Sequence, residues 1–401
     1  MSRSTPSFLL FVLLAVAILG GMHAYLWARL VRDAALPEPW RRIATVALVL
    51  LALAVPVAMA AMRLAPPPID RIVPAIAFTW LGVAFMLLCA VAALDLVRFL
   101  STAGTWLSGW MRAGVAGPPA DPDRRLFVAR ALAGTAAAAT AGTGAFAYRA
   151  ATGPAEITEV PVKLARLPPA LSGLSIAQIT DLHVGPMIRE REVRRIVEQT
   201  NALRPDVVAV TGDLVDGSVA ELGPAVASLS RLQARYGVYF VTGNHEYYSG
   251  VTPWIAELRR LGLRVLRNER VSVGDAGASL DLAGVDDWSA ARFGNGHGWR
   301  LADALAGREP DRSLVLLAHQ PRGVAEAVRS GVELQVSGHT HGGQIFPFSL
   351  IVGAVYPYLA GLYHHAEGAA SGQIFVSRGA GYWGPPLRLG SPPEIAKIVL
   401  T

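Results

Sequence analysis

The sequence predicts an α/β domain that follows an all-α, membrane-spanning region. Four long apolar stretches lie within the first 150 of the 401 residues. After about residue 172 the chain instead alternates short apolar runs with amphipathic segments, a pattern typical of sheets covered by helices. Five of the short runs lead directly into clusters of Asp, Asn and His, which indicates a site where the strands end.

The charge of the chain divides near residue 150. Residues 1–150 hold 13 Arg and 6 acidic residues, and the rest holds 23 Lys or Arg and 24 acidic residues. The net charge of +6 therefore comes from the first part. Because the arginines there separate long apolar runs, they are topology signals of a membrane protein. We expect no nucleic-acid partner, although the pI is near 9.7.

The four apolar stretches are expected to be transmembrane helices. The first three each have about 20 residues or more with almost no charge, enough to cross a hydrocarbon layer of about 30 Å. The fourth is rich in Ala and follows the paired Arg124 and Arg125, as in a twin-arginine export signal, so it is either retained or cleaved. The stretches are residues 7–27, 43–62, 72–97 and 126–147.

The arginines between the stretches predict the orientation. One side carries eight, in residues 28–42 and 98–125: Arg29, Arg32, Arg41, Arg42, Arg98, Arg112, Arg124 and Arg125. The other side carries four: Arg3, Arg63, Arg71 and Arg149. Positive loops stay in the cytoplasm, so four spans place both ends of residues 1–401 outside. We expect a multi-pass protein of the cell (inner) membrane whose later part faces the periplasm or exterior.

Residues 151–171 are expected to form a linker, because Gly and Pro recur there and break regular structure. The domain after it, residues 172–401, contains no cysteine, since the only one, Cys89, lies in the third apolar stretch. Any metal ion in this domain must therefore be held by His, Asp, Asn or Glu.

The short apolar runs of this domain are expected strands, and the amphipathic segments between them are expected helices. The strands are residues 174–179, 207–210, 238–241, 279–282, 314–317, 334–336, 374–376 and 395–400. The helices include residues 190–203, 219–234, 253–261 and 323–329.

Polar clusters follow five of these strands. They contain Asp181 and His183; Asp213 and Asp216; Asn244, His245 and Glu246; His319; and His339 and His341. Because loops at the carboxyl ends of strands converge on one crevice, we expect these side chains to lie close together. Carboxylate oxygen and imidazole nitrogen suit divalent ions, and one carboxylate can bridge two ions about 3.5–4 Å apart.

In content and order these clusters resemble the calcineurin-like metallophosphoesterases, whose motifs run D-x-H, G-D-x-x-D, G-N-H-D/E, H and G-H-x-H. All five elements occur here in that order, over about residues 172–401. Residues 338–344, 377–381 and 393–395 further resemble bacterial membrane-linked or exported members. The resemblance implies a four-layer sandwich of two mixed β-sheets flanked by helices.

The resemblance also implies the role of each residue in a centre of two divalent ions, which would be Mn, Fe, Zn or Co. The implied ligands are Asp181, His183 and His341 for one ion, Asn244, His319 and His339 for the other, and Asp213 for both. The ions would activate water as hydroxide, which attacks phosphorus in line with the leaving group. His245 would be catalytic, stabilising developing charge and protonating the leaving oxygen.

Three further residues are expected near the site. Asp216 and Glu246 would orient ligands rather than bind an ion. Arg378 has two interpretations, a contact to phosphate or a surface ion pair.

The aromatic-rich segment 346–363 also has two interpretations. It is either an apolar lip that admits a lipid tail or leans on a bilayer, or ordinary loop packing, and the second is favoured.

The motifs together indicate a membrane-anchored phosphoesterase. We expect hydrolysis of a phosphomonoester, phosphodiester or pyrophosphate bond, and the anchor makes a phosphorylated, lipid-linked substrate the best fit. One alternative is a phosphoprotein phosphatase. Another is a catalytically inactive membrane sensor or scaffold, against which the complete ligand set argues.

Overall fold

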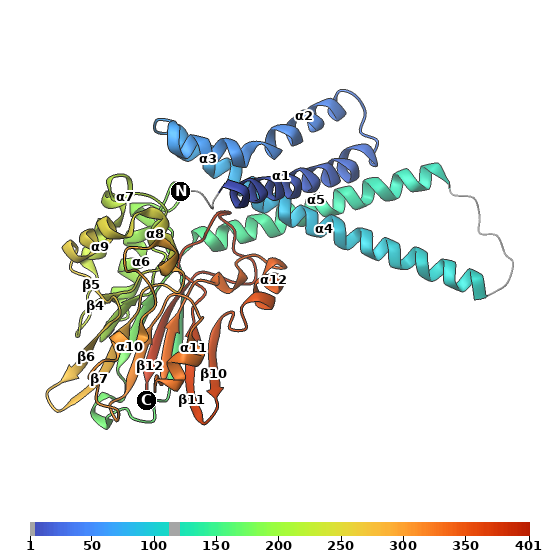
Figure 1. The fold of residues 1–401 in the computed structure, drawn as a ribbon. Helices are drawn as coiled ribbons and strands as arrows, with labels where there is room; N and C mark the ends of the chain where they lie inside the picture. The colour runs from blue at the N-terminus through green and yellow to red at the C-terminus, as the bar shows by residue number, and fades with distance from the viewer. Residues whose placement is uncertain (1–4, 112–120) are drawn as a thin grey trace. The chain divides into compact units, whose positions relative to one another are not determined.

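The structure is a computed structural model that describes residues 5–111 and 121–401 (Figure 1). It divides into two compact units, Met1–Tyr148 and Arg149–Thr401. Arg3 and Arg112, which were counted for the orientation, lie outside the described residues.

The first unit is helical, as its apolar stretches predict. Within residues 5–111 and 121–152, three helices are long and apolar enough to cross a membrane, and the pair α2 and α3 adds a fourth crossing if it forms one span. The helices are α1 (Thr5–Trp27), which continues as the π-helical turn η1 (Ala28–Arg32), α2 (Trp40–Ala52), α3 (Ala54–Leu64), α4 (Ile69–Met111) and α5 (Pro122–Thr152).

The second apolar stretch differs from the single helix expected over residues 43–62. It is broken at Leu53, where α2 and α3 meet at a bend of 48°. Pro56 provides the reason, because it has no N–H for the carbonyl of Ala52 and its ring crowds that turn.

The third stretch is longer than expected, since α4 continues from residue 97 to Met111. No proline interrupts the chain between Pro74 and Pro118, so nothing there ends the helix. Inside the unit, Arg29 pairs with Asp95 at 2.8 Å, which ties α1 and η1 to α4 and neutralises the carboxylate.

The second unit contains two six-stranded sheets. In the first, all neighbouring strands are parallel except β12 and β2. Its order is β1 (Glu156–Val162), β12 (Glu394–Leu400), β2 (Ser175–Ile179), β3 (Val207–Val210), β4 (Val238–Phe240), β5 (Arg264–Val265). The second has antiparallel outer pairs, in the order β10 (Gly361–Glu367), β11 (Ala370–Val376), β9 (Leu334–Ser337), β8 (Leu314–Leu317), β7 (Ala278–Gly284), β6 (Glu269–Asp275).

Helices cover the outer face of each sheet. The first sheet is covered by α6 (Glu190–Ala202), α7 (Val219–Val226) with the 3-10 turn η3 (Ala227–Arg231), and α9 (Val251–Arg260). The second is covered by α10 (Leu301–Ala304) and α11 (Val324–Arg329). The two mixed sheets with their helices confirm the predicted four-layer sandwich.

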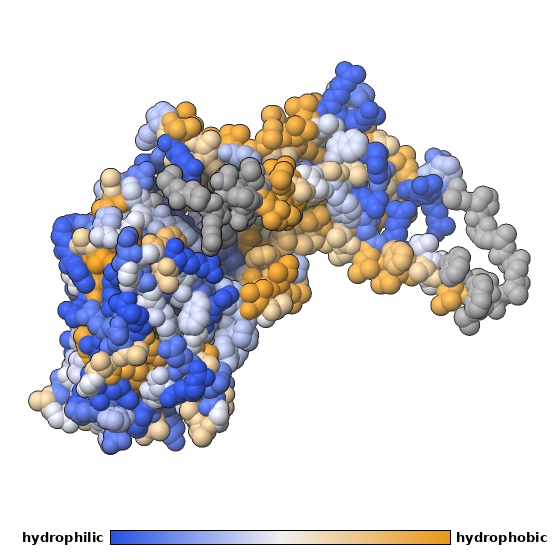
Figure 2. Space-filling view, viewed as in Figure 1, coloured by the Kyte–Doolittle hydropathy of each residue, from blue (hydrophilic) through white to orange (hydrophobic). Residues whose placement is uncertain are grey.

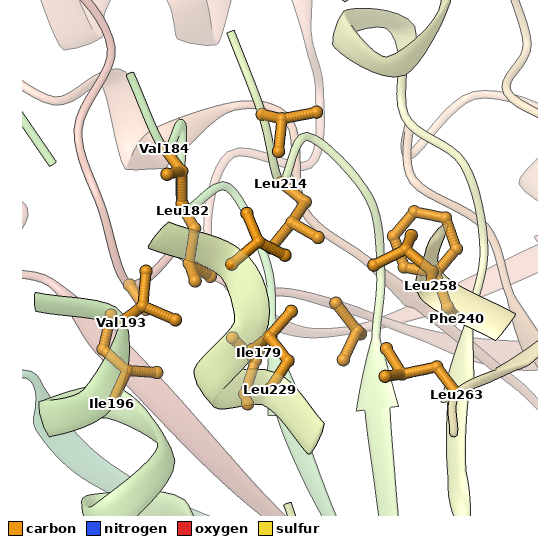
Figure 3. Packing of buried hydrophobic residues seen from close by; sticks show 14 of the residues in the cluster. Ile179, Leu182, Val184, Val193, Ile196, Leu214, Leu229, Phe240, Leu258 and Leu263 are labelled. Atoms are coloured by element: carbon orange, nitrogen blue, oxygen red, sulfur yellow. The ribbon is translucent and has the colours of Figure 1, made fainter. Parts of the chain in front are cut away.

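Alternation along the strands builds two separate cores. In β3, Val207 and Ala209 point into the core between the sheets, whereas Val208 and Val210 point to the helices. Figure 3 shows the helix-side core, where Ile179 and Phe240 from the sheet meet Leu229 and Leu258 from η3 and α9. Each such fully buried side chain contributes about 1.5–3 kcal/mol.

The expected linker 151–171 differs most from the structure. Residues 156–162 form β1, which pairs in parallel with β12 along its whole length. The prolines suggested a linker, but β1 is an edge strand with a neighbour on one side only. An edge strand tolerates Pro161, because no strand on its open side needs a hydrogen bond from that position. Residues 151–155 still belong to the second unit, and Ala151 and Ala155 are buried in its helix-side core.

Several other elements were not expected, among them the edge strands β5 and β6. β10, at an edge of the second sheet, is half-exposed and lacks a clear apolar run. Helix α12 (Phe348–Val355) forms within the aromatic-rich segment 346–363, and none of its residues is buried. The ordinary loop packing favoured for this segment holds for Tyr358 and Tyr363, which pack against the second sheet and α11, but not for the exposed side chains of α12.

Candidate metal centre

The five polar clusters meet at one end of the sandwich. They follow β2, β3, β4, β8 and β9, whose carboxyl ends lie at neighbouring edges of the two sheets. A direct link joins the two sheets there, because the backbone N–H of His339 donates to both oxygens of Asp181, at 3.1 and 3.0 Å. The structure thus brings the predicted ligands together.

One donor group consists of Asp181, His183 and His341. The Nε2 atoms of the two histidines are 3.1 Å apart, and Nε2 of His341 is 3.3 Å from Oδ1 of Asp181. One ligand atom from each residue lies within 4.8 Å of the other two, so a single ion could contact all three. All three residues are buried.

Asp213, His319 and His339 form a second donor group of the same kind. Oδ2 of Asp213 is 3.1 Å from Nε2 of His319, which lies 3.2 Å from Nδ1 of His339. Oδ2 of Asp213 is also 3.9 Å from Nε2 of His183, so this carboxylate lies between the two groups. Asn244 is buried too, and its Oδ1 has no hydrogen-bond partner among the described residues.

The backbone at these residues is strained. Five of the ten non-glycine residues with positive φ in the described chain are predicted ligands: Asp181, His183, Asp213, His339 and His341, with φ between 50° and 75°. Each such conformation costs about 1 kcal/mol or more, and such strain concentrates at functional sites.

Two glycines permit the close approach of the loops. A Cβ on Gly243 would lie 2.2 Å from Oδ1 of Asp213, and one on Gly338 would lie 2.3 Å from Oδ2 of Asp181. No larger residue fits at either position without moving a predicted ligand.

Asp216 and Glu246 contact the ligands without completing a donor group. Asp216 lies 3.2 Å from Nδ1 of His183 and 2.5 Å from Nδ1 of His245. Glu246 accepts hydrogen bonds from the backbone N–H groups of Asp213, Leu214 and Gly243, at 3.0, 2.7 and 2.6 Å. Asp216 therefore orients two imidazoles, and Glu246 holds the loop that carries Asp213.

His245 lies beside the donor groups but is oriented by other contacts. Its Nδ1 faces Asp216, its backbone N–H donates to Asp213 at 2.8 Å, and its Nε2 is 3.9 Å from Oδ2 of Asp213. Burial would lower the pKa of His245, but the hydrogen bond with Asp216 and the charge of Asp213 raise it to about 9. The ring therefore carries a proton at neutral pH.

Two of the predicted histidine ligands are neutral without an ion, and a third, His319, is charged. Burial would lower the pKa of His319, but the charge of Asp213 and its hydrogen bond raise it well above the usual value. Burial, aided by the charge of His319, lowers the pKa of His339 to about 3. Burial and the charge of Arg388 lower the pKa of His341 as well, so both imidazoles are neutral.

Burial raises the pKa of Asp181, which means that the protein alone does not compensate this carboxylate. A bound divalent ion would compensate it. Together with Oδ1 of Asn244, which has no hydrogen-bond partner in the described part of the chain, this indicates that the residues fit such a group.

Sequence reasoning missed Arg388 and Tyr356. Arg388 is only 1% exposed, and its guanidinium donates to the carbonyls of Gly381, Arg378 and His341, the last at 2.9 Å. The hydroxyl of Tyr356 lies 2.9 Å from Nε2 of His339. Neither residue belongs to a strand-end cluster, so no local pattern marks it.

Arg378, the third residue expected near the site, makes ion pairs. Its guanidinium lies 3.0 Å from Glu394 and 3.3 Å from Glu156, and its side chain is 22% exposed. Of the two interpretations of Arg378, the structure therefore favours the ion pair over a contact to phosphate.

Known proteins share these features. Residues 174–343 match the family model described as calcineurin-like phosphoesterase. A bovine protein, described as a transmembrane protein with metallophosphoesterase domain, is 39% identical over 335 residues, which cover 81% of this chain and 73% of the bovine protein. The chain belongs to the calcineurin-like phosphoesterase family. Members of this family are metal-dependent hydrolases with a dimetal centre.

A bacterial protein and a solved structure are also similar to the chain. A Helicobacter pylori protein described as an uncharacterized metallophosphoesterase is 41% identical over 246 residues, covering 61% of this chain and 64% of that protein. The solved structure of NAD nucleotidase from Haemophilus influenzae is 17% identical, with a TM-score of 0.36, over 51% of this chain and 50% of that one. The transmembrane relative and the apolar helices support membrane association.

Proposed function

We propose that this chain is a membrane-anchored enzyme that hydrolyses a phosphomonoester, phosphodiester or pyrophosphate bond at a centre of two divalent ions. The observation that carries the proposal is the position of Asp213, which lies between two complete donor groups. A carboxylate shared in this way is what two ions about 3.5–4 Å apart require.

The assignment of ligands follows the two groups. Asp181, His183 and His341 hold one ion, His319, His339 and Asn244 hold the other, and Asp213 contacts both. When bound, the ions supply a nucleophile from water at neutral pH and neutralise charge on the phosphoryl oxygens. Their identity among Mn, Fe, Zn and Co depends on supply as well as on geometry, because all accept imidazole and carboxylate ligands.

His245 is proposed as the proton donor to the leaving oxygen. Asp216 fixes the ring through Nδ1, which leaves Nε2 free to face the substrate. Its side chain is 16% exposed, so it can contact a bound ester at the entrance of the centre. His245 also forms a third donor group with Asp213 and His183. We assign no ion to this group, because Asp216 already neutralises the charge of the protonated His245 ring.

The activity test uses the full chain in detergent. After removal of bound metal, each of Mn, Fe, Zn and Co is added, and release of nitrophenol from nitrophenyl phosphate and bis-nitrophenyl phosphate is followed. We expect hydrolysis with at least one ion. Binding of the ions without turnover of either ester would contradict the proposal and favour an inactive sensor or scaffold.

The substrate and the location of the centre are proposed from the anchor. With α2 and α3 counted as one span, we propose that the chain crosses the inner membrane four times with its catalytic unit in the periplasm, which the arginine distribution supports. A lipid-linked phosphoester is then within reach. Fusion of alkaline phosphatase after residue 150 tests the orientation: an active fusion is expected, and a fusion inactive at normal expression would reverse it.

A further inference from the structure

Helix α12 presents an apolar surface to solvent beside the candidate metal centre. We define the α12 surface as Phe346, Phe348, Leu350, Ile351 and Val355, which are 53, 46, 66, 59 and 60% exposed. In Figure 2 a hydrophobic patch lies at the position of α12 in Figure 1. Exposed apolar surface of this kind marks a binding surface in a soluble domain.

The composition of the segment identifies the kind of partner. Residues 345–363 contain no Asp, Glu, Lys or Arg, but they contain five aromatic residues. Surfaces that bind another protein normally surround their apolar core with a rim of polar and charged residues. The Leu, Ile, Val and Phe side chains of the α12 surface are instead of the kind that proteins place at the boundary between lipid headgroups and acyl chains.

Both ends of α12 are joined to the metal centre. Before the helix, Gly343 follows the predicted ligand His341 and lies so close to Ser349 that an added Cβ would come within 2.3 Å of its Cα. After the helix, the hydroxyl of Tyr356 contacts His339 at 2.9 Å. A molecule whose phosphate reaches the donor groups therefore has α12 at its side.

Trp383 adds a second apolar group at this entrance. Its ring is 5.9 Å from the ring of His245, and the residue is 57% exposed. Its backbone is held by the side chain of Gln344, which accepts from its N–H at 3.0 Å and donates to its carbonyl at 3.0 Å. Gln344 also immediately follows the turn that carries His341, so Trp383 and the α12 surface flank the same centre.

The path of the chain gives an independent reason to place this end of the unit next to a bilayer. β1 is parallel to β12, and β12 is antiparallel to β2, so β1 begins at the edge where β2 ends and Asp181 lies. Contacts agree, because Glu156 pairs with Arg378, whose carbonyl accepts from Arg388, which in turn contacts His341.

The membrane helix that precedes β1 is close along the chain. α5 ends at Thr152, and β1 begins at Glu156. The three residues between them span at most about 11 Å. Thr152 is fixed to the second unit by Arg195, which donates to its carbonyl at 3.0 Å. The chain therefore enters β1 at the end of the second unit that carries the metal centre.

We infer that the α12 surface sits in the headgroup region of the bilayer and directs the metal centre toward the membrane, so that the substrate is the phosphoester of a lipid headgroup. The choice of a lipid phosphoester as substrate rests on the proposed phosphoesterase function. The position of the α12 surface in the bilayer does not depend on that function. Trp383 would stand at the same level as the α12 surface, with His245 behind it. The occupant is the lipid, rather than a second copy or another protein.

The depth of α12 tests the geometry without any assay of activity. In the full chain with Cys89→Ala, Leu350→Cys is spin-labelled in nanodiscs of phosphatidylethanolamine and phosphatidylglycerol. Ala276→Cys, exposed in the turn between β6 and β7, is the matched control. We expect the label at 350 to be relaxed more by oxygen than by a nickel chelate, and the control to show the reverse.

Two results would overturn the inference. One is a label at 350 as accessible to the nickel chelate as the label at 276. The other is dipolar broadening at 350 that disappears on dilution with unlabelled chain, since a second copy would then cover the surface.

Activity tests the choice of substrate. The variant Leu350→Glu with Ile351→Glu should lose at least about tenfold in hydrolysis of a long-chain phospholipid in nanodiscs, because charge is excluded from the acyl boundary. Its rate on a soluble nitrophenyl ester should stay within about twofold of the parent, and Ala276→Glu should change neither. Equal losses on both substrates contradict the inference. Failure of the unaltered protein on every ester would instead contradict the proposed function, whatever the depth result.

Discussion

Oδ1 of Asp216 lies 2.5 Å from Nδ1 of His245, and the same carboxylate lies 3.2 Å from Nδ1 of His183. One side chain thus orients both the proposed proton donor and a proposed ligand. We expect Asp216→Asn to lower kcat by about 10- to 100-fold and to weaken metal binding, because an amide cannot accept at both imidazoles equally well. Asp275→Asn, an exposed carboxylate on β6, is the control, and equal kcat values for the two variants would contradict the role.

Variants of His245 and Asp213 should affect turnover and metal binding differently. His245→Ala is expected to lower kcat by about 100- to 10,000-fold while metal content, measured by mass spectrometry of the purified protein, stays near that of the parent. Asp213→Asn should lower both quantities, because it removes the charge shared by the two donor groups. The opposite pattern would exchange the two roles.

Arg388 should be required for stability. Removing its guanidinium leaves the carbonyls of Gly381, Arg378 and His341 without donors in a buried site. We expect Arg388→Leu to lower the free energy of unfolding by about 2–4 kcal/mol, measured as a lower melting temperature of the second unit. Arg378→Leu, at a partly exposed ion pair, should cost about 1 kcal/mol or less.

β1 should belong to the smallest stable form of the catalytic unit. A fragment of residues 149–401 is expected to be soluble and to melt cooperatively. A fragment of residues 172–401 loses Val160, Val162 and Leu164 from the core between the sheets, at a cost of about 5 kcal/mol in total. Equal melting temperatures for the two fragments would show that β1 is dispensable.

Removal of metal should destabilise the unit as well as abolish activity. Among the described residues Oδ1 of Asn244 has no hydrogen-bond partner, and burial raises the pKa of Asp181, so bound cations would stabilise both groups. Chelation should therefore lower the melting temperature, by the equivalent of about 4 kcal/mol if ions are present at a thousand times Kd. Asp213→Asn serves as the control, and its melting temperature should respond little to chelator.

The sequence was sufficient to predict the strands that carry the site, because they are buried on both faces and appear as uninterrupted apolar runs such as Val207–Val210. Each run is followed within a few residues by its polar cluster, so the donors could be found by position alone. The structure places all seven predicted ligands at one end of the sandwich.

Features that depend on distant parts of the chain could not be predicted. β1 is held by β12, whose paired residues lie 238 positions later in the chain. Because β1 pairs on one edge only, it can contain a proline, and a segment with prolines looks like a linker in the sequence. Arg388 is buried by the carbonyls of Arg378 and Gly381, which lie in its own loop, and by that of His341 in the loop after β9, and no local pattern contains this set. The bend at Leu53 arises from Pro56, but an apolar run that crosses a membrane tolerates a proline, so hydropathy alone shows one helix.

The order of strands in the first sheet has a consequence for synthesis. β12 lies between β1 and β2, yet it is the last strand along the chain, and contacts such as that between Lys397 and Glu159 join residues 238 positions apart. While the ribosome is still making residues 163–393, β1 and the edge of β2 have no partner. The catalytic unit therefore completes its fold only after translation has passed residue 400, and the nascent chain must be kept from pairing with other strands until then.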